Sequence, residues 1–368
     1  MAIVFDILSR DTDIGGLASL NRFGYKESGI VNSDVVITDD TIIPYCLDSD
    51  SECLIFTQMP LGFDLTSAPF IFISQKLLAI KLIAVPYAEL DSLADKVAMP
   101  NKLVFIQSTG RAGSTLISQV LNRVDGVCSF SEPDFFTNFI PLAYHAENKK
   151  SLVPLLQNCL KLFIYPFADQ TVSIKFRSDN IDIAELFHLA FTEAKHIFIY
   201  RNAIDWSASW WNILENNGMA NDGDVDFIGD SNRIAGRSDH LQACLPEGVV
   251  KVPGLTGFLA LWLFNVDAYL RAVEHGVPFF TFKFEDLLSD RRLMLEKLFE
   301  YIDIPLTQLD RALIGFEKHS QKRGEKFDGG NALAMTQEQI NTITQLLAQH
   351  PRSLTFDETL TGTVHPQC

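Results

Sequence analysis

The stretch 103–121 reads LVFIQSTGRAGSTLISQVL, and the expected fold follows from it. Its first four residues form a continuous apolar run, as a strand buried on both faces of a parallel sheet requires. A loop with Gly110 and Gly113 follows, and then a helical pattern begins. Glycines let such a loop turn tightly with its N–H groups pointing inward, and the helix adds the positive end of its dipole. The stretch therefore predicts a phosphate-binding strand–loop–helix unit, with the Ser114 and Thr115 hydroxyls as further donors.

The rest of the chain after residue 100 repeats this alternation of strand and helix. Further buried strands are expected at Val172–Phe176, His196–Tyr200 and Pro278–Phe284. Helical patterns are found at Thr115–Leu121, Ser151–Ile164, Ile181–Ala194, Asn202–Leu214, Leu255–Glu274, about Arg291–Ile302 and about Thr336–Gln349. Strands that alternate with helices at this spacing indicate βαβ units. We therefore expect an α/β fold with a P-loop-type parallel sheet and helices on both of its faces.

Residues 1–98 differ from this pattern. They consist of short runs rich in Ile, Val and Phe, broken by Asp, Pro and Gly, and such runs predict a β-rich region. No chemistry is recognisable in them, and a lid, an oligomer surface or additional core are all compatible with their composition. The predicted organisation is thus a β-rich N-terminal region, 1–98, followed by one nucleotide-binding domain, 99–368.

The charge of the chain restricts its ligands. Acidic residues outnumber basic ones 46 to 30, which gives a formal net charge of −16. An acidic surface repels phosphate backbones, so broad nucleic-acid binding is not expected. An anionic ligand must be held by a local concentration of cationic side chains and backbone N–H groups.

Cysteine usage and hydropathy suggest the compartment. The six cysteines show no CxxC motif and no close metal-ligand spacing, which favours reduced thiols in a cytoplasmic protein. No signal-peptide pattern and no apolar run long enough to cross a bilayer is recognisable, so no membrane association is expected. Three aspartates at 222–226 begin like a calcium loop, but Phe227 stands where glycine is needed, and we expect no metal.

A second element, HIFIYRNAIDWSASWW at 196–211, also suits a phosphate. A buried strand ends in Arg201, and Asn202 then caps a helix with Asp205 at the position that completes a capping box. Ser209 lies about two turns into that helix. An arginine at the strand tip and a serine on the adjoining helix can hold one phosphate from two sides. Considered alone, Arg201 is equally compatible with a surface salt bridge, and Ser209 is equally compatible with a packing residue.

The sequence of this loop does not match the P-loop motif of proteins that bind nucleoside triphosphates. The P-loop motif GxxxxGK[ST] requires a lysine after the second glycine, and here Ser114 follows Gly113.

Lys175 and Arg177 lie at the end of the strand at 172–176, so the predicted strand ends are rich in cations. Because ligands of such sheets bind at the carboxyl ends of the strands, these cations are expected near the ligand.

STGRAGSTL and, about 90 residues later, YRNAIDWSASW together resemble the two signature motifs of sulfotransferases that use 3′-phosphoadenosine 5′-phosphosulfate (PAPS). The resemblance covers roughly residues 100–330. It implies that the loop holds the 5′-phosphosulfate and that Arg201 and Ser209 hold the 3′-phosphate. The residues so implied for the donor and its product PAP are Gly110, Arg111, Ala112, Gly113, Ser114, Thr115, Arg201, Ser209, Arg323 and Gly324. The last two belong to a permuted form of the family's Arg-Lys-Gly turn.

The resemblance also implies catalytic roles. Arg111 stands where many members have lysine and is placed to neutralise the leaving phosphate, while Lys175 matches a lysine near the sulfuryl group in some members. The histidine base of the cytosolic branch is replaced by Arg177, which cannot accept a proton. The segment FSEPDFF at 130–136 resembles the acidic base position of other branches, so Glu132 is the predicted general base. The alternative is that its carboxylate caps a helix or pairs with Arg111 or Lys175.

The acceptor side is less defined. His240 and His188 are alternative bases, and Glu132, Arg177 and His240 are candidate acceptor contacts. The long stretch 216–254 is either a flap over the acceptor or a solvated insertion. The sequence thus predicts a cytoplasmic, metal-independent sulfotransferase that moves a sulfuryl group from PAPS to a hydroxyl or amine of a small molecule. A nucleotide kinase or NTPase, or a non-catalytic nucleotide-binding protein of the same fold, are the alternatives.

Overall fold

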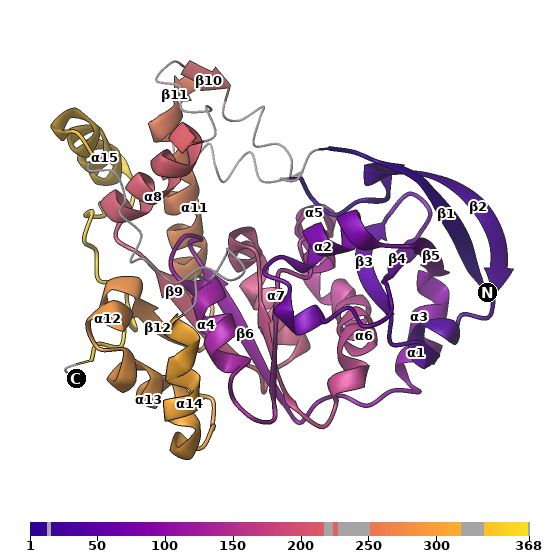
Figure 1. Cartoon of the computed structure of the whole chain (residues 1–368). Coiled ribbons are helices and arrows are strands. Elements are labelled where there is room, and N and C mark those ends of the chain that lie inside the picture. The colour runs from indigo at the N-terminus through magenta and orange to yellow at the C-terminus, as the bar shows by residue number, and fades with distance from the viewer. Residues whose placement is uncertain (13–15, 217–223, 227–250, 318–334, 367–368) are drawn as a thin grey trace. The chain divides into compact units, whose positions relative to one another are not determined.

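The computed structural model describes residues 1–12, 16–216, 224–226, 251–317 and 335–366 (Figure 1). The chain divides into two compact units. Unit 1 comprises Met1–Phe105 and Leu121–Ala194, and unit 2 comprises Ile106–Val120 and Lys195–Cys368. The N-terminal region therefore shares a unit with residues 121–194, and the predicted boundary near residue 98 stays a prediction.

Two five-stranded sheets form the framework. The first is antiparallel, with strand order β2-β1-β5-β4-β3. The second is parallel, with order β12-β9-β6-β8-β7, and β6 contributes residues to both units. The strands are β1 (Ala2–Arg10), β2 (Phe23–Val31), β3 (Ile42–Asp48), β4 (Cys53–Gln58), β5 (Lys81–Pro86), β6 (Lys102–Ser108), β7 (Val127–Ser131), β8 (Thr171–Lys175), β9 (Lys195–Tyr200) and β12 (Phe279–Lys283). A short pair, β10 (Asp224–Asp226) and β11 (Lys251–Pro253), is antiparallel. The predicted fold class is confirmed.

Helices occupy most of the remaining described chain. Those of unit 1 are α1 (Val35–Thr38), α2 (Ile71–Leu78), α3 (Tyr87–Ala94), α5 (Phe139–His145), α6 (Val153–Ile164) and α7 (Ala184–Ala190), with short 3-10 turns that include η3 (Asp134–Phe136). Those of unit 2 are α8 (Ala203–Asn216), α11 (Gly254–Glu274), α12 (Phe284–Ser289), α13 (Arg291–Tyr301), α14 (Leu309–Leu313) and α15 (Gln337–Gln349); α4 (Ser114–Leu121) begins in unit 2 and ends in unit 1. Within unit 2, α11 packs against α8 and α15.

Two elements depart from the sequence-based expectation. The run at 69–88, whose composition predicts strands, forms helix α2 before it forms β5. The periodicity of such an apolar run does not distinguish a buried strand from a buried helix. Strand β7 is absent from the sequence-based prediction because VCSFS is short and half polar. It forms through its parallel pairing with β8, in which Val127 lies opposite Thr171 and Ser131 opposite Lys175.

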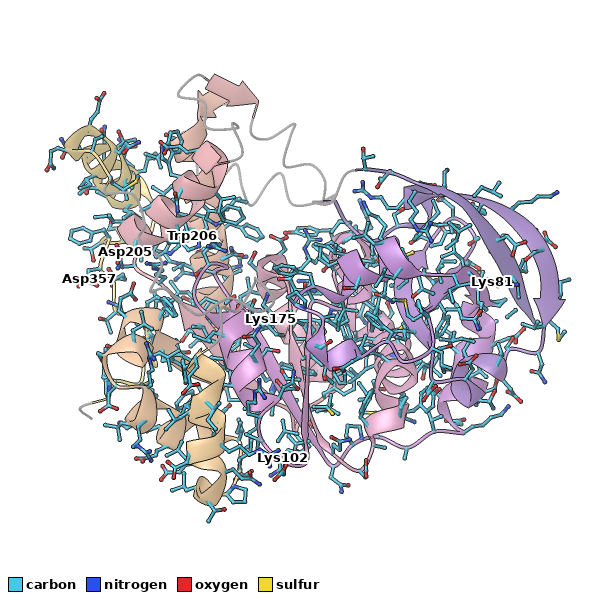
Figure 2. All side chains as sticks on the ribbon, in the orientation of Figure 1. Lys81, Lys102, Lys175, Asp205, Trp206 and Asp357 are labelled. Atoms are coloured by element: carbon cyan, nitrogen blue, oxygen red, sulfur yellow. The ribbon has the colours of Figure 1, made fainter. Side chains whose placement is uncertain are left out.

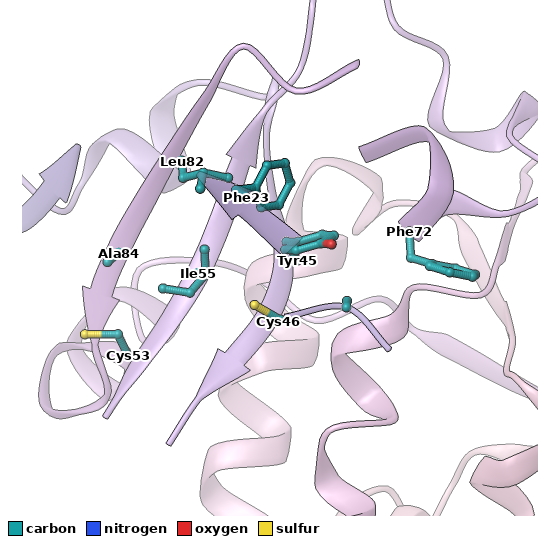
Figure 3. Close-up of a cluster of buried hydrophobic side chains, with 9 residues drawn as sticks. Phe23, Tyr45, Cys46, Cys53, Ile55, Phe72, Leu82 and Ala84 are labelled. Atoms are coloured by element: carbon teal, nitrogen blue, oxygen red, sulfur yellow. The ribbon is translucent and has the colours of Figure 1, made fainter. Parts of the chain in front are cut away.

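Unit 1 has two hydrophobic clusters that matter for the site. The first joins strands of the antiparallel sheet to helix α2, and Figure 3 shows its side chains. Its buried members are Ala18, Phe23, Tyr45, Cys46, Cys53, Ile55, Phe72, Leu82 and Ala84. The second is a group of phenylalanines around Phe176, whose ring centroid lies 5.4 Å from Phe105, 5.3 Å from Phe136 and 4.4 Å from Phe187. These rings fix the end of β8 and the adjoining η3.

Candidate functional site

The predicted phosphate-binding loop in unit 2 has the backbone that its glycines predict. Gly110, Arg111 and Gly113 have φ values of 72°, 49° and 81°, all in the left-handed region. A Cβ on Gly113 would lie 2.4 Å from a ring carbon of Phe284, so glycine is required there by both conformation and space. Helix α4 begins directly after it, at Ser114. The loop thus presents a helix N-terminus and a glycine-rich turn, the combination that binds phosphate.

Hydrogen bonds fix the loop from within. The Gly110 N–H donates to Ser108 Oγ at 3.2 Å, and that hydroxyl donates to Ser114 Oγ at 3.0 Å. Ser114 and Thr115 are buried, as is Ala112. The two predicted donor hydroxyls therefore lie at the start of α4, and the Ser114 hydroxyl also has a structural partner.

The buried indole of Trp206 holds the loop from outside. Its Nε1 donates to the carbonyl oxygens of Thr109 at 3.0 Å and Gly110 at 2.9 Å (Trp206 is labelled in Figure 2). A second indole, Trp262 on α11, donates from Nε1 to the carbonyl oxygen of Arg201 at 2.9 Å. Both anion-binding segments of unit 2 are thus tethered by tryptophans. The sequence offered no signal for these tethers, since a tryptophan on an apolar helix face is also ordinary core.

Arg111 and Ser209 meet in unit 2. The Arg111 Nε donates to Ser209 Oγ at 3.1 Å, which joins the loop to helix α8 across 98 residues of sequence. Burial lowers the pKa of the Arg111 guanidinium, and the positive charge of Arg201 lowers it further. The two guanidinium groups repel each other, and a serine hydroxyl lies beside them. Such a group of donors is suited to binding an anion.

Arg201 stands at the tip of β9, as predicted. Its guanidinium carbon lies 5.3 Å from the centroid of the Phe284 ring, and its Nε lies 3.7 Å from Glu285 Oε1. That distance is too long for a hydrogen bond, and the buried Nε has no hydrogen-bond partner among the residues that the structure describes. A buried, unpartnered N–H of a cation is available to a ligand oxygen.

The helix cap next to Arg201 differs from the predicted capping box. Asn202 Oδ1 accepts from the Asp205 N–H at 2.8 Å, but the Asp205 carboxylate accepts from Asn202 Nδ2 at 2.6 Å rather than from the backbone. The backbone N–H of Asn202 points instead to Glu285 Oε1, at 3.3 Å, and Nδ2 donates to the same oxygen at 2.8 Å. Burial raises the pKa of Glu285, with the Asn202 N–H and Arg201 opposing it. Glu285 therefore orients both Arg201 and its cap, a role that its sequence did not reveal.

In unit 1, Glu132 and Lys175 form an ion pair. Glu132 Oε1 accepts from Lys175 Nζ, and the side chains are only 13% and 6% exposed (Lys175 is labelled in Figure 2). The Glu132 N–H donates to the Lys175 carbonyl at 2.7 Å. Glu132 has a φ of 55°, and a non-glycine residue in this left-handed region is strained. Strain of this kind concentrates at functional sites, which supports a role for this carboxylate.

Arg177 also lies in unit 1, beside Asp134. Its Nη1 donates to Asp134 Oδ2 at 3.2 Å and to the carbonyl of Gly16 at 3.3 Å. Burial raises the pKa of Asp134, and the Arg177 guanidinium opposes that effect. A contact of Arg177 with the acceptor stays a prediction. So does the alternative base His188, which lies on α7.

Several predicted positions fall outside the described residues. These are His240, Arg323 and Gly324, together with most of the predicted flap 216–254. Over the ranges that the structure covers, no group of three or more His, Cys, Asp or Glu side chains could hold a metal ion. None of the described helices is long and apolar enough to cross a membrane.

A glycine-turned loop at a strand–helix junction, two neighbouring arginines and a serine lie together in an α/β protein, an arrangement suited to an anionic ligand. The chain belongs to the sulfotransferase family, because the sulfotransferase domain matches residues 101–338, well over half of its length. The prediction made from the two motifs is confirmed, and with it sulfuryl transfer as the reaction. No curated protein matches the chain.

The solved structures that resemble the chain are distant. A sulfotransferase from Alicyclobacillus acidocaldarius is 14% identical over 70% of this chain and 95% of its own, with a TM-score of 0.43. One from Mycobacterium avium is 15% identical over 75% and 82%, with a TM-score of 0.44. A mouse sulfotransferase complexed with PAP is 12% identical over 72% and 90%, with a TM-score of 0.41. Similarity at this level adds nothing to the family assignment.

Proposed function

We propose that the protein is a PAPS-dependent sulfotransferase that acts on a hydroxyl or amine of a small molecule. The observation that carries this proposal is the group of Arg111, Ser209 and Arg201 in unit 2. A nucleotide with a single phosphate chain would occupy the loop and leave the buried Arg201 Nε, whose ion pair with Glu285 is 3.7 Å long, without a hydrogen-bond partner among the described residues. A nucleotide with an additional 3′-phosphate gives both segments a ligand, which favours PAPS over ATP.

The fit to the donor rests on the chemistry of these groups. The loop offers backbone N–H groups and the N-terminus of α4 for the 5′-phosphosulfate, and Arg201 with Ser209 offers a guanidinium and a hydroxyl for the 3′-phosphate. The lysine of kinases is absent, since Ser114 follows Gly113. This speaks against the alternative of a nucleotide kinase or NTPase.

The reaction is an in-line displacement at sulfur. A bond forms between sulfur and the acceptor oxygen or nitrogen while the bond from sulfur to the bridging phosphate oxygen breaks, and that electron pair stays on the phosphate of PAP. We assign neutralisation of this phosphate to Arg111 and of the sulfuryl oxygens to Lys175. We assign the acceptor proton to the Glu132 carboxylate, which Lys175 holds in place by its ion pair.

The Glu132 carboxylate also speaks against the second alternative, a nucleotide-binding protein without turnover. Nucleotide binding alone does not explain a strained, nearly buried glutamate paired with a lysine where two neighbouring strands end. The free cysteines Cys46, Cys53, Cys128 and Cys159 in the described part of the chain support a reducing compartment, in keeping with the predicted cytoplasmic location.

The test is a thermal-shift panel of PAP, ADP, ATP and NAD, followed by transfer of labelled sulfate from PAPS to a phenol, an alcohol and an amine. A ligand at 100 times its Kd adds about 2.7 kcal/mol to stability. We expect stabilisation by PAP well above that by ADP, because only PAP carries the 3′-phosphate. Equal stabilisation by PAP and ADP, or selectivity for ATP, would overturn the proposal.

A further inference from the structure

Two carboxylate–cation pairs lie side by side in unit 1. Glu132 pairs with Lys175, and two residues further along each segment Asp134 pairs with Arg177. Alternate residues of an extended segment point to opposite sides, so Lys175 and Arg177 share one side while Phe176 points into the phenylalanine cluster. The second pair is therefore built on the same two segments as the proposed base and is connected to it by only two peptide units.

The second pair is held by the N-terminal region. The Ala18 N–H donates to Asp134 Oδ2 at 2.6 Å, and the Gly16 carbonyl accepts from Arg177 Nη1 at 3.3 Å. The Arg177 guanidinium carbon lies 4.9 Å from the centroid of the Phe72 ring, at the start of helix α2. We call Gly16, Ala18 and Phe72 the N-terminal clamp.

The same region holds the segment after Asp134 as well. Asn138 Nδ2 donates to the Ala18 carbonyl at 3.2 Å, and Asn138 Oδ1 accepts from the Leu47 N–H of β3 at 3.0 Å. The ring of Phe70, just before α2, lies 6.0 Å from Lys175 Nζ. Two hydrogen bonds of Arg177, to Gly16 and Asp134, span 161 and 43 residues of sequence. The segments around Asp134 and Arg177 are thus held by more contacts with the N-terminal region than an ordinary surface turn makes.

The backbone of Glu132 explains why such support is required. A φ of 55° is unfavourable for a glutamate, and so sparsely populated a conformation persists only where the surroundings over-determine it. Glu132 is held by the hydrogen bond from its N–H to the Lys175 carbonyl, and two residues later in the chain lies the fully buried Asp134. Relaxation of Asp134 would let Glu132 leave the left-handed region and swing its carboxylate away from Lys175.

We propose that the N-terminal clamp, acting through the Asp134–Arg177 pair, positions Glu132 for proton transfer, so that the first hundred residues are part of the catalytic apparatus. This inference rests on Glu132 being the general base of the proposed function. Asp134, Arg177 and the clamp are positioning residues, because they reach the reacting atoms only through Glu132. The sulfotransferase domain match begins at residue 101, so this role lies outside the part of the chain that defines the family.

The experiment compares D134N/R177Q with wild type in three measurements. They are amide hydrogen exchange of residues 131–136, steady-state kinetics with PAPS, and PAP affinity. Replacing both members of a buried ion pair by neutral groups of similar shape avoids an uncompensated buried charge. The amides introduced at positions 134 and 177 keep an acceptor for Ala18 and a donor for Gly16, so the fold is retained while the charges are lost. The control is D34N/K96Q, an exposed ion pair of the N-terminal region, at 2.6 Å, whose residues make none of the contacts described for the clamp.

We expect the amides of 131–136 to exchange about tenfold faster or more in D134N/R177Q, since local opening follows the loss of the contacts that hold a segment. We expect kcat to fall by about tenfold or more, with KM for PAPS and PAP affinity within about twofold of wild type. The control should match wild type in all three. Asn138→Ala, which leaves both charges in place, should change exchange and kcat in the same direction and covers the case in which D134N/R177Q fails to fold.

Unchanged exchange at 131–136 in the folded variant, or faster exchange with unchanged kcat, would overturn the inference. If Arg177→Gln raised the KM for the acceptor and Asp134→Asn did not, Arg177 would be a contact of the acceptor and the positioning role would be overturned. Failure of the proposed function is a different result: wild type would then neither prefer PAP over ADP nor transfer sulfate. Because the exchange measurement needs no turnover, the two failures are distinguishable.

Discussion

In unit 2, Arg111 and Arg201 lie close enough for each charge to disfavour the other, and Arg111 donates to the neutral hydroxyl of Ser209. In unit 1, Lys175 and Arg177 are each paired with a buried or nearly buried carboxylate. The first arrangement has an excess of positive charge that a phosphate can relieve. The second is balanced, because each cation has a carboxylate beside it. The two groups of cations therefore differ in their electrostatics, and in the proposed function the first serves donor binding and the second acceptor activation.

The two regions also differ in how they are constructed. The anion-binding loop of unit 2 is a contiguous segment whose conformation follows from its own glycines. In unit 1, by contrast, Asp134 beside the proposed base is held by Ala18, which lies 116 residues away in the sequence. Substitutions in the two regions should therefore separate nucleotide affinity from turnover, and four predictions test that separation.

The largest effect is expected from Glu132→Gln. The amide keeps the size of the carboxylate but cannot accept the acceptor proton, so kcat should fall by about 10²–10⁴-fold. PAP affinity, measured by titration calorimetry, should be unchanged because the proposed PAP ligands are in the other set of residues. The matched control is Glu52→Gln, since Glu52 is another glutamate with a left-handed backbone, at φ 51°. Near-normal turnover of Glu132→Gln between pH 6 and 9 would remove Glu132 as the base.

Arg201→Ala should produce the largest loss of nucleotide affinity. Loss of a charge-assisted contact to the 3′-phosphate should weaken PAP binding by about 2–3 kcal/mol. Binding of adenosine 5′-phosphosulfate, which lacks the 3′-phosphate, should weaken far less. Arg292→Ala, in which an exposed arginine of the same unit is lost, serves as the control. Equal losses for both nucleotides would contradict the assignment of Arg201 to the 3′-phosphate.

Trp206→Phe should have a smaller effect on the same region. The change keeps a buried aromatic ring but removes the N–H that donates to Thr109 and Gly110, and each such hydrogen bond contributes about 0.5–1.5 kcal/mol. PAP affinity should fall by a few-fold, and kcat at saturating PAPS should stay close to wild type. Trp211→Phe, whose indole donates instead to Glu215, provides the comparison on the same helix. An equal change in PAP affinity in both variants would mean that Trp206 does not hold the loop.

The smallest effect concerns the pH dependence of stability at Glu285. Burial raises the pKa of this carboxyl above its ordinary value of 4.5, so the folded protein binds the proton more tightly than the unfolded chain does. The contribution of Glu285 to stability therefore declines as pH rises above that ordinary value. Glu285→Gln mimics the protonated form and should melt above wild type at pH 7, with a difference that shrinks toward pH 5.

Glu274 supplies a control of opposite sign for that measurement. Its hydrogen bonds with Arg352 lower its pKa, so its contribution is present at neutral pH and is lost in acid. Glu274→Gln should therefore melt at or below wild type at pH 7 and converge with it as pH falls through the lowered pKa. A Glu285→Gln variant that behaves like Glu274→Gln would show that the ion pair with Arg201 outweighs the burial of the carboxyl.

Residues close together in the chain were sufficient to predict the parallel sheet, the anion-binding loop, and the placement of Arg201 and Ser209 on a strand tip and helix. Each of these features depends on a short segment: a buried apolar run, glycines with positive φ, or a capped helix. Local conformation is governed by local sterics and hydrogen bonds, so a single segment carries the information. Pairing of Glu132 with Lys175 was one of several alternatives that the sequence left open for this carboxylate, and the tertiary structure decided among them.

The surroundings of those residues followed only from tertiary packing. Trp206 and Trp262 became tethers of the anion-binding segments, Glu285 became the partner of Asn202, and strand β7 formed only through its pairing with β8. The same holds for the N-terminal clamp, in which Gly16 and Ala18 contact Arg177 and Asp134 through backbone atoms. Backbone N–H and C=O groups are the same in every residue, so nothing in the sequence marks which of them will meet a distant side chain. Their partners are fixed when the sheets and the phenylalanine cluster pack, because buried polar groups must then be paired.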